Sequence, residues 1–213
     1  MKDRKDVFKF NIVSQLRFTE KGMPILNGTN YIPQELISFN YALTEKSKSS
    51  KGVHFYIDDY QFERVWNEPN RYLNLLRKFS CVIMPDFSMF RNTPTPMQIW
   101  NSFRSKLIAC YYEQSGITVI PNLNWSNEES LKFSLDGLPR YSVVALSTNG
   151  VLNKETKESF LRCYKLATEQ LQPLKILIVG KIPEELKSDE RIIKFESHSE
   201  RFDKLEVKHG RKK

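Results

Sequence analysis

Cysteine and histidine are scarce, with three of each among 213 residues. The cysteines, Cys81, Cys110 and Cys163, lie far apart in apolar stretches, which is typical of reduced, buried thiols and excludes a disulfide framework. No HExxH or paired CxxC spacing occurs, so a zinc site is not expected. The GxSxG, GxGxxG and P-loop signatures are absent too, which argues against an ordinary serine hydrolase, a dinucleotide dehydrogenase and a P-loop NTPase.

Long apolar runs and low-complexity tracts are also absent. No apolar run approaches the roughly 20 residues that cross a bilayer, and 8 Gly and 10 Pro leave no low-complexity tract. The first residues, MKDRKDVFKFN, carry charge where a secretory signal needs an apolar segment. With 40% hydrophobic and 27% charged residues, the composition fits one globular domain, and we expect a cytoplasmic protein without membrane contact.

Positive charge is in excess, with 33 Lys and Arg against 25 Asp and Glu and a net charge of +8. The excess is densest at the two ends, since residues 1–51 hold nine basic and five acidic residues and residues 196–213 hold six and four. Such ends could contact nucleic-acid phosphates without reading the sequence of bases. They are also explained as two solvated, flexible ends.

From residue 52 onward, short apolar runs alternate with long amphipathic stretches, which is the pattern of repeated βα units and a largely parallel sheet. Six runs rich in Val, Ile or Phe are predicted to be strands. They are Val53–Ile57, Cys81–Met84, Ile117–Ile120, Ser142–Leu146, Lys175–Val179 and Ile192–Phe195.

Between these runs, apolar residues recur at helical spacing. The pattern predicts helices over Gln61–Phe79, with a break at Pro69, over Met97–Gln114 and over Lys154–Leu171. Only a short helix, Pro183–Lys187, fits between the last two strands.

The sequence therefore predicts an α/β fold in which a predominantly parallel sheet of about six strands is flanked by helices. Six units are too few for a closed eight-stranded barrel, so an open doubly wound sheet is the first choice and an incomplete or six-stranded β/α barrel the second. Residues 1–51 are interpreted as an irregular N-terminal extension packed on the core, able to supply an edge strand or a lid. The α/β domain then covers residues 52–196, and a basic tail covers residues 197–213.

Ligands of parallel α/β sheets bind beyond the carboxyl ends of the strands, so the residues directly after each apolar run are candidates for a site. Polar residues follow five of the predicted strands, and we expect them to converge on one rim. They are Asp58 and Asp59, Asp86 and Ser88, Asn122, Asn124 and Trp125, Ser147, Thr148 and Asn149, and Lys181.

Three aspartates at two successive strand ends, Asp58, Asp59 and Asp86, are the candidate catalytic residues. Such a set could hold Mg²⁺ or Mn²⁺, which would polarise a phosphate and activate water, or one carboxylate could act as a general base. A structural interpretation competes, because an aspartate before the helix at Gln61 is a favoured N-cap. Asp86 could likewise cap a turn.

The other rim residues are candidates for ligand binding. Trp125 could stack on a base or a sugar, with the neighbouring asparagines supplying hydrogen bonds. The polar turn at residues 147–149 could present N–H groups to an anion, and Lys181 could neutralise a phosphate. The first is also explained as an ordinary turn, and the second as an exposed loop lysine.

Several segments together resemble one family. They are VHFYIDDYQFERVW at 53–66, PDFS at 85–88, QIWN at 98–101, PNLNW at 121–125, STNG at 147–150 and KILIVGK at 175–181. In these segments the chain is similar to uncharacterised bacterial proteins that are associated with phages and other mobile genetic elements and carry a domain-of-unknown-function label. The resemblance covers roughly residues 30–185. It implies an accessory role in a mobile element, and it assigns no catalytic residue.

Two functional hypotheses follow. In the first, the strand-end rim binds a phosphorylated ligand, a nucleotide or a nucleic-acid backbone, with divalent-metal-assisted phosphoester chemistry at the three aspartates. In the second, the chain is a non-enzymatic factor that binds a host defence or replication protein, and the rim carboxylates are structural.

Overall fold

The computed structural model describes residues 6–149 and 154–197. Within them the chain forms seven strands, and every strand pairing is parallel. The strands are β1 (Glu35–Ser38), β2 (Lys51–His54), β3 (Cys81–Ile83), β4 (Val119–Ile120), β5 (Val143–Ser147), β6 (Lys175–Val179) and β7 (Ile192–Phe195).

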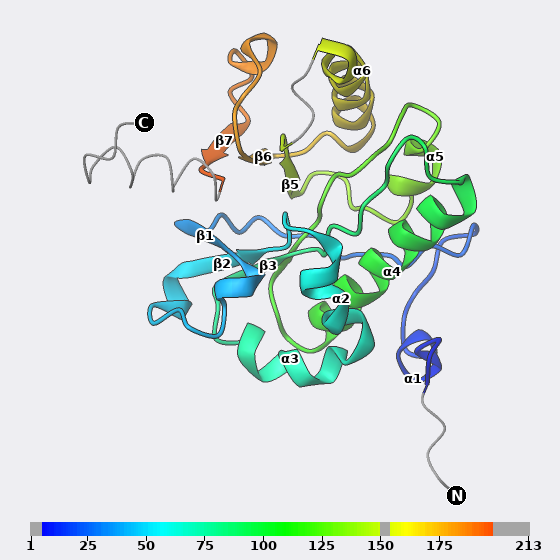
Figure 1. Ribbon diagram of the computed structural model, residues 1–213, viewed down its shortest axis with the longest axis vertical. Coiled ribbons are helices and arrows are strands. Elements are labelled where there is room, and N and C mark those ends of the chain that lie inside the picture. Colours follow the sequence, from blue (N-terminus) through cyan, green and yellow to red (C-terminus); the bar gives the residue numbers. More distant parts are fainter. Residues whose placement is uncertain (1–5, 150–153, 198–213) are drawn as a thin grey trace, which may run out of the picture.

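The strands follow one another in chain order, as β1-β2-β3-β4 in one sheet and β5-β6-β7 in a second. The two sheets meet at Ala145 of β5, which pairs with Asn122 just after β4. Ala145 N–H donates to the carbonyl of Pro121 (2.9 Å), and its own carbonyl accepts from Leu123 N–H (2.7 Å). The seven strands therefore form one nearly continuous arc (Figure 1).

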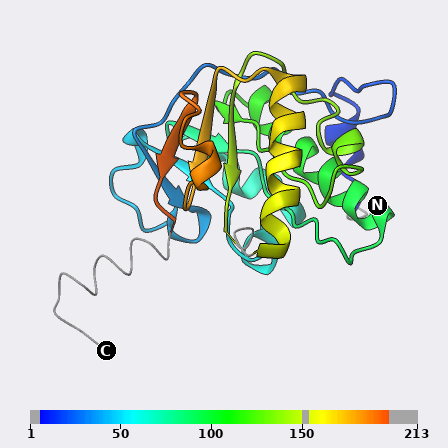
Figure 2. The same ribbon diagram turned by 90° about the horizontal axis from the view of Figure 1, so that it is seen from above.

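The longer helices lie on the outside of this arc (Figure 1), and α6 runs beside the strands of the second sheet (Figure 2). The α-helices are α1 (Phe10–Val13), α2 (Asp59–Asn67), α3 (Pro69–Leu76), α4 (Thr95–Gln114), α5 (Leu131–Ser134) and α6 (Lys154–Leu171). Three short 3-10 helices are η1 (Phe39–Tyr41), η2 (Lys48–Ser50) and η3 (Glu184–Leu186).

Successive residues of a strand belong alternately to two separate cores, as expected for buried strands, whose side chains alternate between the two faces. In β6, Ile176 and Ile178 belong to the large core against the helices, whereas Leu177 and Val179 belong to a smaller inner core. The inner core also receives Leu36 from β1. Its other members, from β3 to β5, from β7 and from just after β2, are Tyr56, Cys81, Ile83, Ile120, Val143, Ala145 and Phe195.

A glycine makes room inside the arc. A Cβ added to Gly52 of β2 would lie 2.6 Å from Cys81 Sγ and 2.8 Å from Leu36 Cδ2. The side chains of β1 and β3 therefore fill the space that a larger residue in β2 would need. This inward packing is that of a barrel wall.

The predicted α/β class with parallel strands is confirmed, but the preferred doubly wound arrangement is not what the chain adopts. A doubly wound sheet reverses its strand order at a switch point, and no reversal occurs within either sheet. The shared inner core and the sequential order match the second alternative, an incomplete β/α barrel. No pairing closes β7 onto β1 within the described residues.

The first predicted strand begins two residues earlier, and ends three residues earlier, than expected. It spans Lys51–His54 instead of Val53–Ile57, because the chain turns directly after His54: Tyr56 N–H donates to His54 Nδ1 (3.2 Å), and Ile57 N–H donates to the carbonyl of Phe55 (2.8 Å). The last two strands begin and end as predicted.

The helix boundaries follow from proline and glycine. Pro69 occupies the first turn of α3, where its fixed φ is favourable, so the predicted break divides one helical pattern into α2 and α3. Gly116, with φ of 81°, ends α4, because its N–H and that of Ile117 bond back to the carbonyls of Glu113 and Tyr112.

The region before residue 52 contributes the edge strand β1, which pairs with β2 from Glu35↔Lys51 to Ser38↔His54. Upstream of it, Thr29 exchanges hydrogen bonds with Ser142 and Val143 at the start of β5. Residues 198–213, which include most of the predicted basic tail, lie outside the described residues. Among the helices that are described, none is both long and apolar enough to cross a membrane.

Candidate functional site

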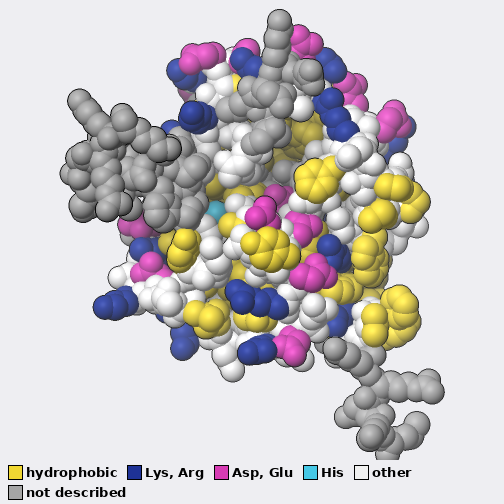
Figure 3. Space-filling model, in the orientation of Figure 1, with side chains coloured by type: hydrophobic (Ala, Val, Ile, Leu, Met, Phe, Trp, Pro, Cys, Tyr) yellow, Lys and Arg dark blue, Asp and Glu magenta, His cyan; other side chains and the backbone are white. Residues whose placement is uncertain are grey.

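A cleft of about 450 Å³ lies at the carboxyl ends of the strands, where the loops after β2, β3, β4 and β5 meet. That volume is ordinary for a small-molecule site. Acidic side chains gather at a hollow near the centre of the face in Figure 3, with hydrophobic side chains beside them. The cleft is lined by Tyr56, Ile57, Asp58, Asp86, Ser88, Met89, Phe90, Asn124, Trp125, Ser147 and Asn149.

Seven of the eleven predicted rim residues are in this lining, namely Asp58, Asp86, Ser88, Asn124, Trp125, Ser147 and Asn149. Asn122 lies behind it, buried at 1% exposure. Thr148 is buried as well, and Lys181 is exposed outside the lining.

Asp59 has a structural role. It is the first residue of α2, and its carboxylate accepts hydrogen bonds from Ser88 N–H (3.1 Å) and from Ser88 Oγ–H (2.8 Å). This carboxylate therefore joins the start of α2 to the loop after β3. Asp58 is the N-cap residue by position, but its side chain makes no capping bond and lies exposed in the cleft.

Asp86 is the carboxylate whose environment is most altered. Burial raises its pKa to about 7, while a hydrogen bond from Asn122 Nδ2 (2.7 Å) opposes the rise and the nearby Asp59 carboxylate adds to it. A carboxyl group with a pKa near neutrality exchanges its proton at physiological pH, which is the property of a general acid or base. Asp86 therefore differs in kind from Asp58 and Asp59.

Asn122 connects Asp86 to a buried tyrosine. Its Oδ1 accepts from the Tyr56 hydroxyl (2.8 Å) while its Nδ2 donates to Asp86. Tyr56 stacks on His54 with ring centroids 5.3 Å apart, and its pKa is raised well above the ordinary value by burial and then by Asp86. The hydroxyl therefore stays protonated and fixes the orientation of the Asn122 amide.

The loop that carries Asp86 is held from several sides. Phe87, 1% exposed, packs on Phe62 and lies under the Arg104 guanidinium at 3.6 Å from the ring centroid. Arg104 in turn forms an ion pair with Glu63 at 2.7 Å. The carbonyls of Ser88 and Phe87 accept from Asn101 Nδ2 (2.6 Å) and Asn124 Nδ2 (3.2 Å). These contacts fix the loop before any ligand arrives.

The second sheet contributes less. Asn149 N–H donates to Ser147 Oγ (3.1 Å), which itself reaches the carbonyl of Val179 at 3.4 Å. Trp125 rests on Phe160 of α6, with centroids 5.6 Å apart, so one face of its ring is used in packing while the side chain still lines the cleft. Gly150, the end of the predicted polar turn, lies outside the described residues.

The predicted three-aspartate metal site for Mg²⁺ or Mn²⁺ is not assembled. Asp59 is committed to Ser88, Asp86 is turned to Asn122, and in the described part of the chain no group of three or more His, Cys, Asp or Glu side chains is arranged to hold a metal ion. Among the described residues, the lining contains no Lys or Arg. A bare phosphate would therefore meet two carboxylates and no cation from this described part of the cleft.

The sequence did not point to four lining residues, Tyr56, Ile57, Met89 and Phe90. Tyr56 falls inside the predicted strand Val53–Ile57. Its place two residues before Asp58 is the signal that points to it as a residue of the rim. Phe90, 63% exposed, resembles an ordinary loop residue in sequence.

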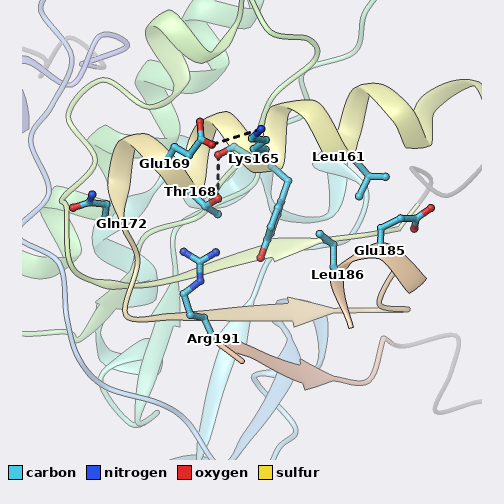
Figure 4. A pocket seen from close by; sticks show the side chains of 9 residues that line it. Leu161, Lys165, Thr168, Glu169, Gln172, Glu185, Leu186 and Arg191 are labelled. Carbon is cyan, nitrogen blue, oxygen red and sulfur yellow. Dashed lines mark hydrogen bonds and ion pairs between the residues drawn. The ribbon is translucent and has the colours of Figure 1, made fainter. Parts of the chain in front are cut away.

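A second groove of about 580 Å³ lies outside the arc, between α6 and the segment that joins β6 to β7 (Figure 4). None of the predicted site residues lines it. Its charged side chains are paired locally: Lys165 with Glu169 (3.9 Å), Glu185 with Lys157 (2.8 Å) and Arg191 with Asp189 (2.7 Å). The strand-end cleft is therefore the better candidate for chemistry.

Comparison with known proteins places these features in a family context. The profile of a family described as a domain of unknown function, DUF4417, matches residues 17–196. The Gene 1 protein of Mycobacterium phage L5 is 31% identical over 183 residues, which cover 82% of this chain and 79% of that protein. The Gene 1 protein of Mycobacterium phage D29 is 30% identical over 163 residues, 75% of this chain and 60% of that protein. No solved structure matches the chain.

Proposed function

We propose that this chain, which belongs to the DUF4417 family, binds a nucleotide or a single-stranded nucleic acid through its base, in the strand-end cleft, and exchanges a proton with it through Asp86. The expected family of phage-associated proteins is confirmed by the comparisons. The observation that carries the proposal is the position of Asp86: a carboxyl with a pKa raised to about 7 lines a cleft that is large enough for such a ligand.

The lining suits a planar ring with polar edges. Aromatic side chains, Trp125 and Phe90, provide surfaces on which a base can stack. Asn124 retains its amide oxygen and one amide hydrogen for the edge of a base, and Ser88 Oγ, whose proton goes to Asp59, can still accept. A protonated Asp86 adds a donor. This combination of apolar surface with a few polar groups is common in small-molecule sites.

The charge of the lining determines how the ligand lies. Because the described lining holds Asp58 and Asp86 without a Lys or Arg, phosphates are disfavoured in the cleft and are directed outward to solvent. A divalent cation carried by the ligand would offset this repulsion at Asp58, the exposed carboxylate. The base, not the phosphate, is therefore the recognised part.

Calorimetric titration tests the proposal. Nucleosides, nucleoside monophosphates and short single-stranded oligonucleotides are titrated with and without Mg²⁺ into the wild type and into Asp86→Asn. We expect nucleosides to bind at least as tightly as monophosphates without Mg²⁺, and Asp86→Asn to weaken binding about tenfold, the effect of one lost hydrogen bond to a charged or titrating group.

Asp6→Asn is the matched control, because Asp6 lies outside the cleft and accepts hydrogen bonds from the N–H groups of Phe10 and Asn11. It should bind as the wild type does. If no nucleoside or oligonucleotide binds at all, or if phosphate alone accounts for the affinity, the proposal is wrong.

A second candidate function, binding of a host defence or replication protein, is favoured by exposed aromatic and aliphatic side chains near α1 and the start of α4. Trp100 (40% exposed) stacks on Phe103 and meets Trp66 edge to face, with Phe10 at 68% and Met97 at 57% exposure. Exposed apolar groups of this size are common in protein interfaces. This role would be supported if the Asp86→Asn variant still captures a partner protein and the Trp100→Ser variant no longer does.

A further inference from the structure

A small cavity of about 10 Å³ adjoins the cleft, and Asn124 and Met89 line both. Its walls come from the loop after β3, the loop after β4, α4 and α5. This volume is about that of one water-sized sphere, which is the least space in which a single water molecule fits. The cavity is lined by Met84, Pro85, Phe87, Met89, Ser102, Ser105, Asn122, Asn124 and Ser134.

One hydroxyl in this lining has no hydrogen-bond partner. Ser134, the last residue of α5, is 4% exposed, and its Oγ is without a partner among the described residues. A buried hydroxyl that bonds to nothing loses its hydration without compensation, so an unpaired one is unusual in folded proteins. The cavity is the space into which it can bond.

Ser102, on the α4 side of the cavity, bonds to a buried lysine. Lys106 is 0% exposed, and its Nζ donates to Ser102 Oγ (2.7 Å) and to the carbonyl of Phe133 (3.0 Å). Burial lowers the pKa of Lys106 to about 7, with Asp136 and then Cys110 opposing. Ser102 Oγ accepts from Lys106 and donates its own proton to the carbonyl of Phe133, at the long distance of 3.5 Å.

The opposite side of the cavity belongs to the cleft network. Asn122 donates one amide hydrogen to Asp86 and accepts from Tyr56. An amide nitrogen carries two hydrogens, so a second donor remains on the same atom. An internal water needs two to four polar partners. Three buried residues around this small space supply them, namely Ser102, Ser134 and Asn122.

We propose that this cavity binds one internal water molecule, which is held by the Ser134 hydroxyl. The water joins Ser102 of α4 to Asn122 behind the cleft. The water completes the hydrogen bonding of Ser134 and offers the Ser102 hydroxyl a closer partner than the carbonyl of Phe133. It also links the helix that buries Lys106 to the amide that holds Asp86, so the back of the cleft is braced by a polar contact. This site does not depend on which ligand the cleft binds.

A high-resolution crystal structure of the full chain tests the site. We expect density for one water in the wild type, about 2.7–3.2 Å from Ser134 Oγ and from at least one of the other two polar groups. In Ser134→Ala the occupancy of this water should fall at least twofold. Ser115→Ala is the matched control, because Ser115 Oγ bonds to the carbonyl of Tyr111 and does not line the cavity; the water should remain.

Two results would overturn the inference: a wild-type structure without density in the cavity, or a water that keeps its full occupancy in Ser134→Ala. If Ser134→Ala does not fold, the wild-type density decides alone, because a Ser134 hydroxyl turned to a carbonyl with no water beside it contradicts the site.

Discussion

The loops that follow the first sheet are fixed by more side-chain hydrogen bonds than the described residues that follow the second sheet. After β3, Ser88 is bonded to Asp59 and Asn101, and Asp86 to Asn122. After β5 and β6, Asn149 and Lys181 are exposed. The difference indicates that the first sheet provides a preorganised wall, on which orientation of a ligand depends, and that the second sheet supplies a more adaptable border.

Among the tests of this difference between the two sheets, Phe87→Ala should have the largest effect on the free energy of unfolding. Phe87 is nearly fully buried against Phe62 and the Arg104 guanidinium, so its removal should lower the free energy of unfolding by about 3–5 kcal/mol. Ile182→Ala, in the loop after β6 where the side chain is half-buried, should cost only about 1 kcal/mol. Urea unfolding measures both, and equal losses would contradict a stiffer first half.

The pH dependence of stability tests Asp86 next. Its pKa is raised from 3.8 to about 7 in the folded state, so the folded protein retains a proton that the unfolded chain releases. Stability from this group is present below pH 4 and is lost as the pH rises to about 7. Wild type should therefore lose about 2–3 kcal/mol more than Asp86→Asn between pH 4 and pH 8, after allowance for the partial exposure of the group.

Urea midpoints for the two proteins across this range give the difference directly, since titration of all other groups is shared by both. Parallel curves would show that Asp86 titrates normally and would remove the basis for proton exchange in the cleft.

Asp59→Ala sharpens the comparison between two neighbouring aspartates. It leaves the Ser88 N–H and hydroxyl without their acceptor, so we expect a loss of about 1.5–2 kcal/mol in unfolding free energy. Asp58→Ala removes an exposed carboxylate with no capping bond and should change stability by less than about 0.5 kcal/mol. Thermal unfolding of both variants decides, and a reversed order would exclude the structural role given to Asp59.

These two aspartates also show where sequence reasoning ends. The alternation of apolar runs predicts the parallel strands, and β6 and β7 emerge with the predicted bounds because both are flanked by turn residues. Local sequence patterns do not determine the order of strands in a sheet, so nothing in the sequence distinguished a doubly wound sheet from a sequential one. Asp59 and Asp86 look alike as strand-end carboxylates; their roles are separated by Ser88 and Asn122, which lie 29 and 36 residues away along the chain.

Lys181→Ala gives the smallest expected effect. Lys181 follows β6 as a strand-end cation should, yet it is exposed and does not line the cleft. Removal of such a side chain should change the free energy of unfolding by less than about 0.5 kcal/mol. It should also leave the affinity for nucleosides unchanged, because no contact to the base is lost. Calorimetry with a nucleoside and with its monophosphate separates the alternatives: a loss confined to the monophosphate would show that the second sheet does hold the phosphate, and that the adaptable border contributes binding energy of its own.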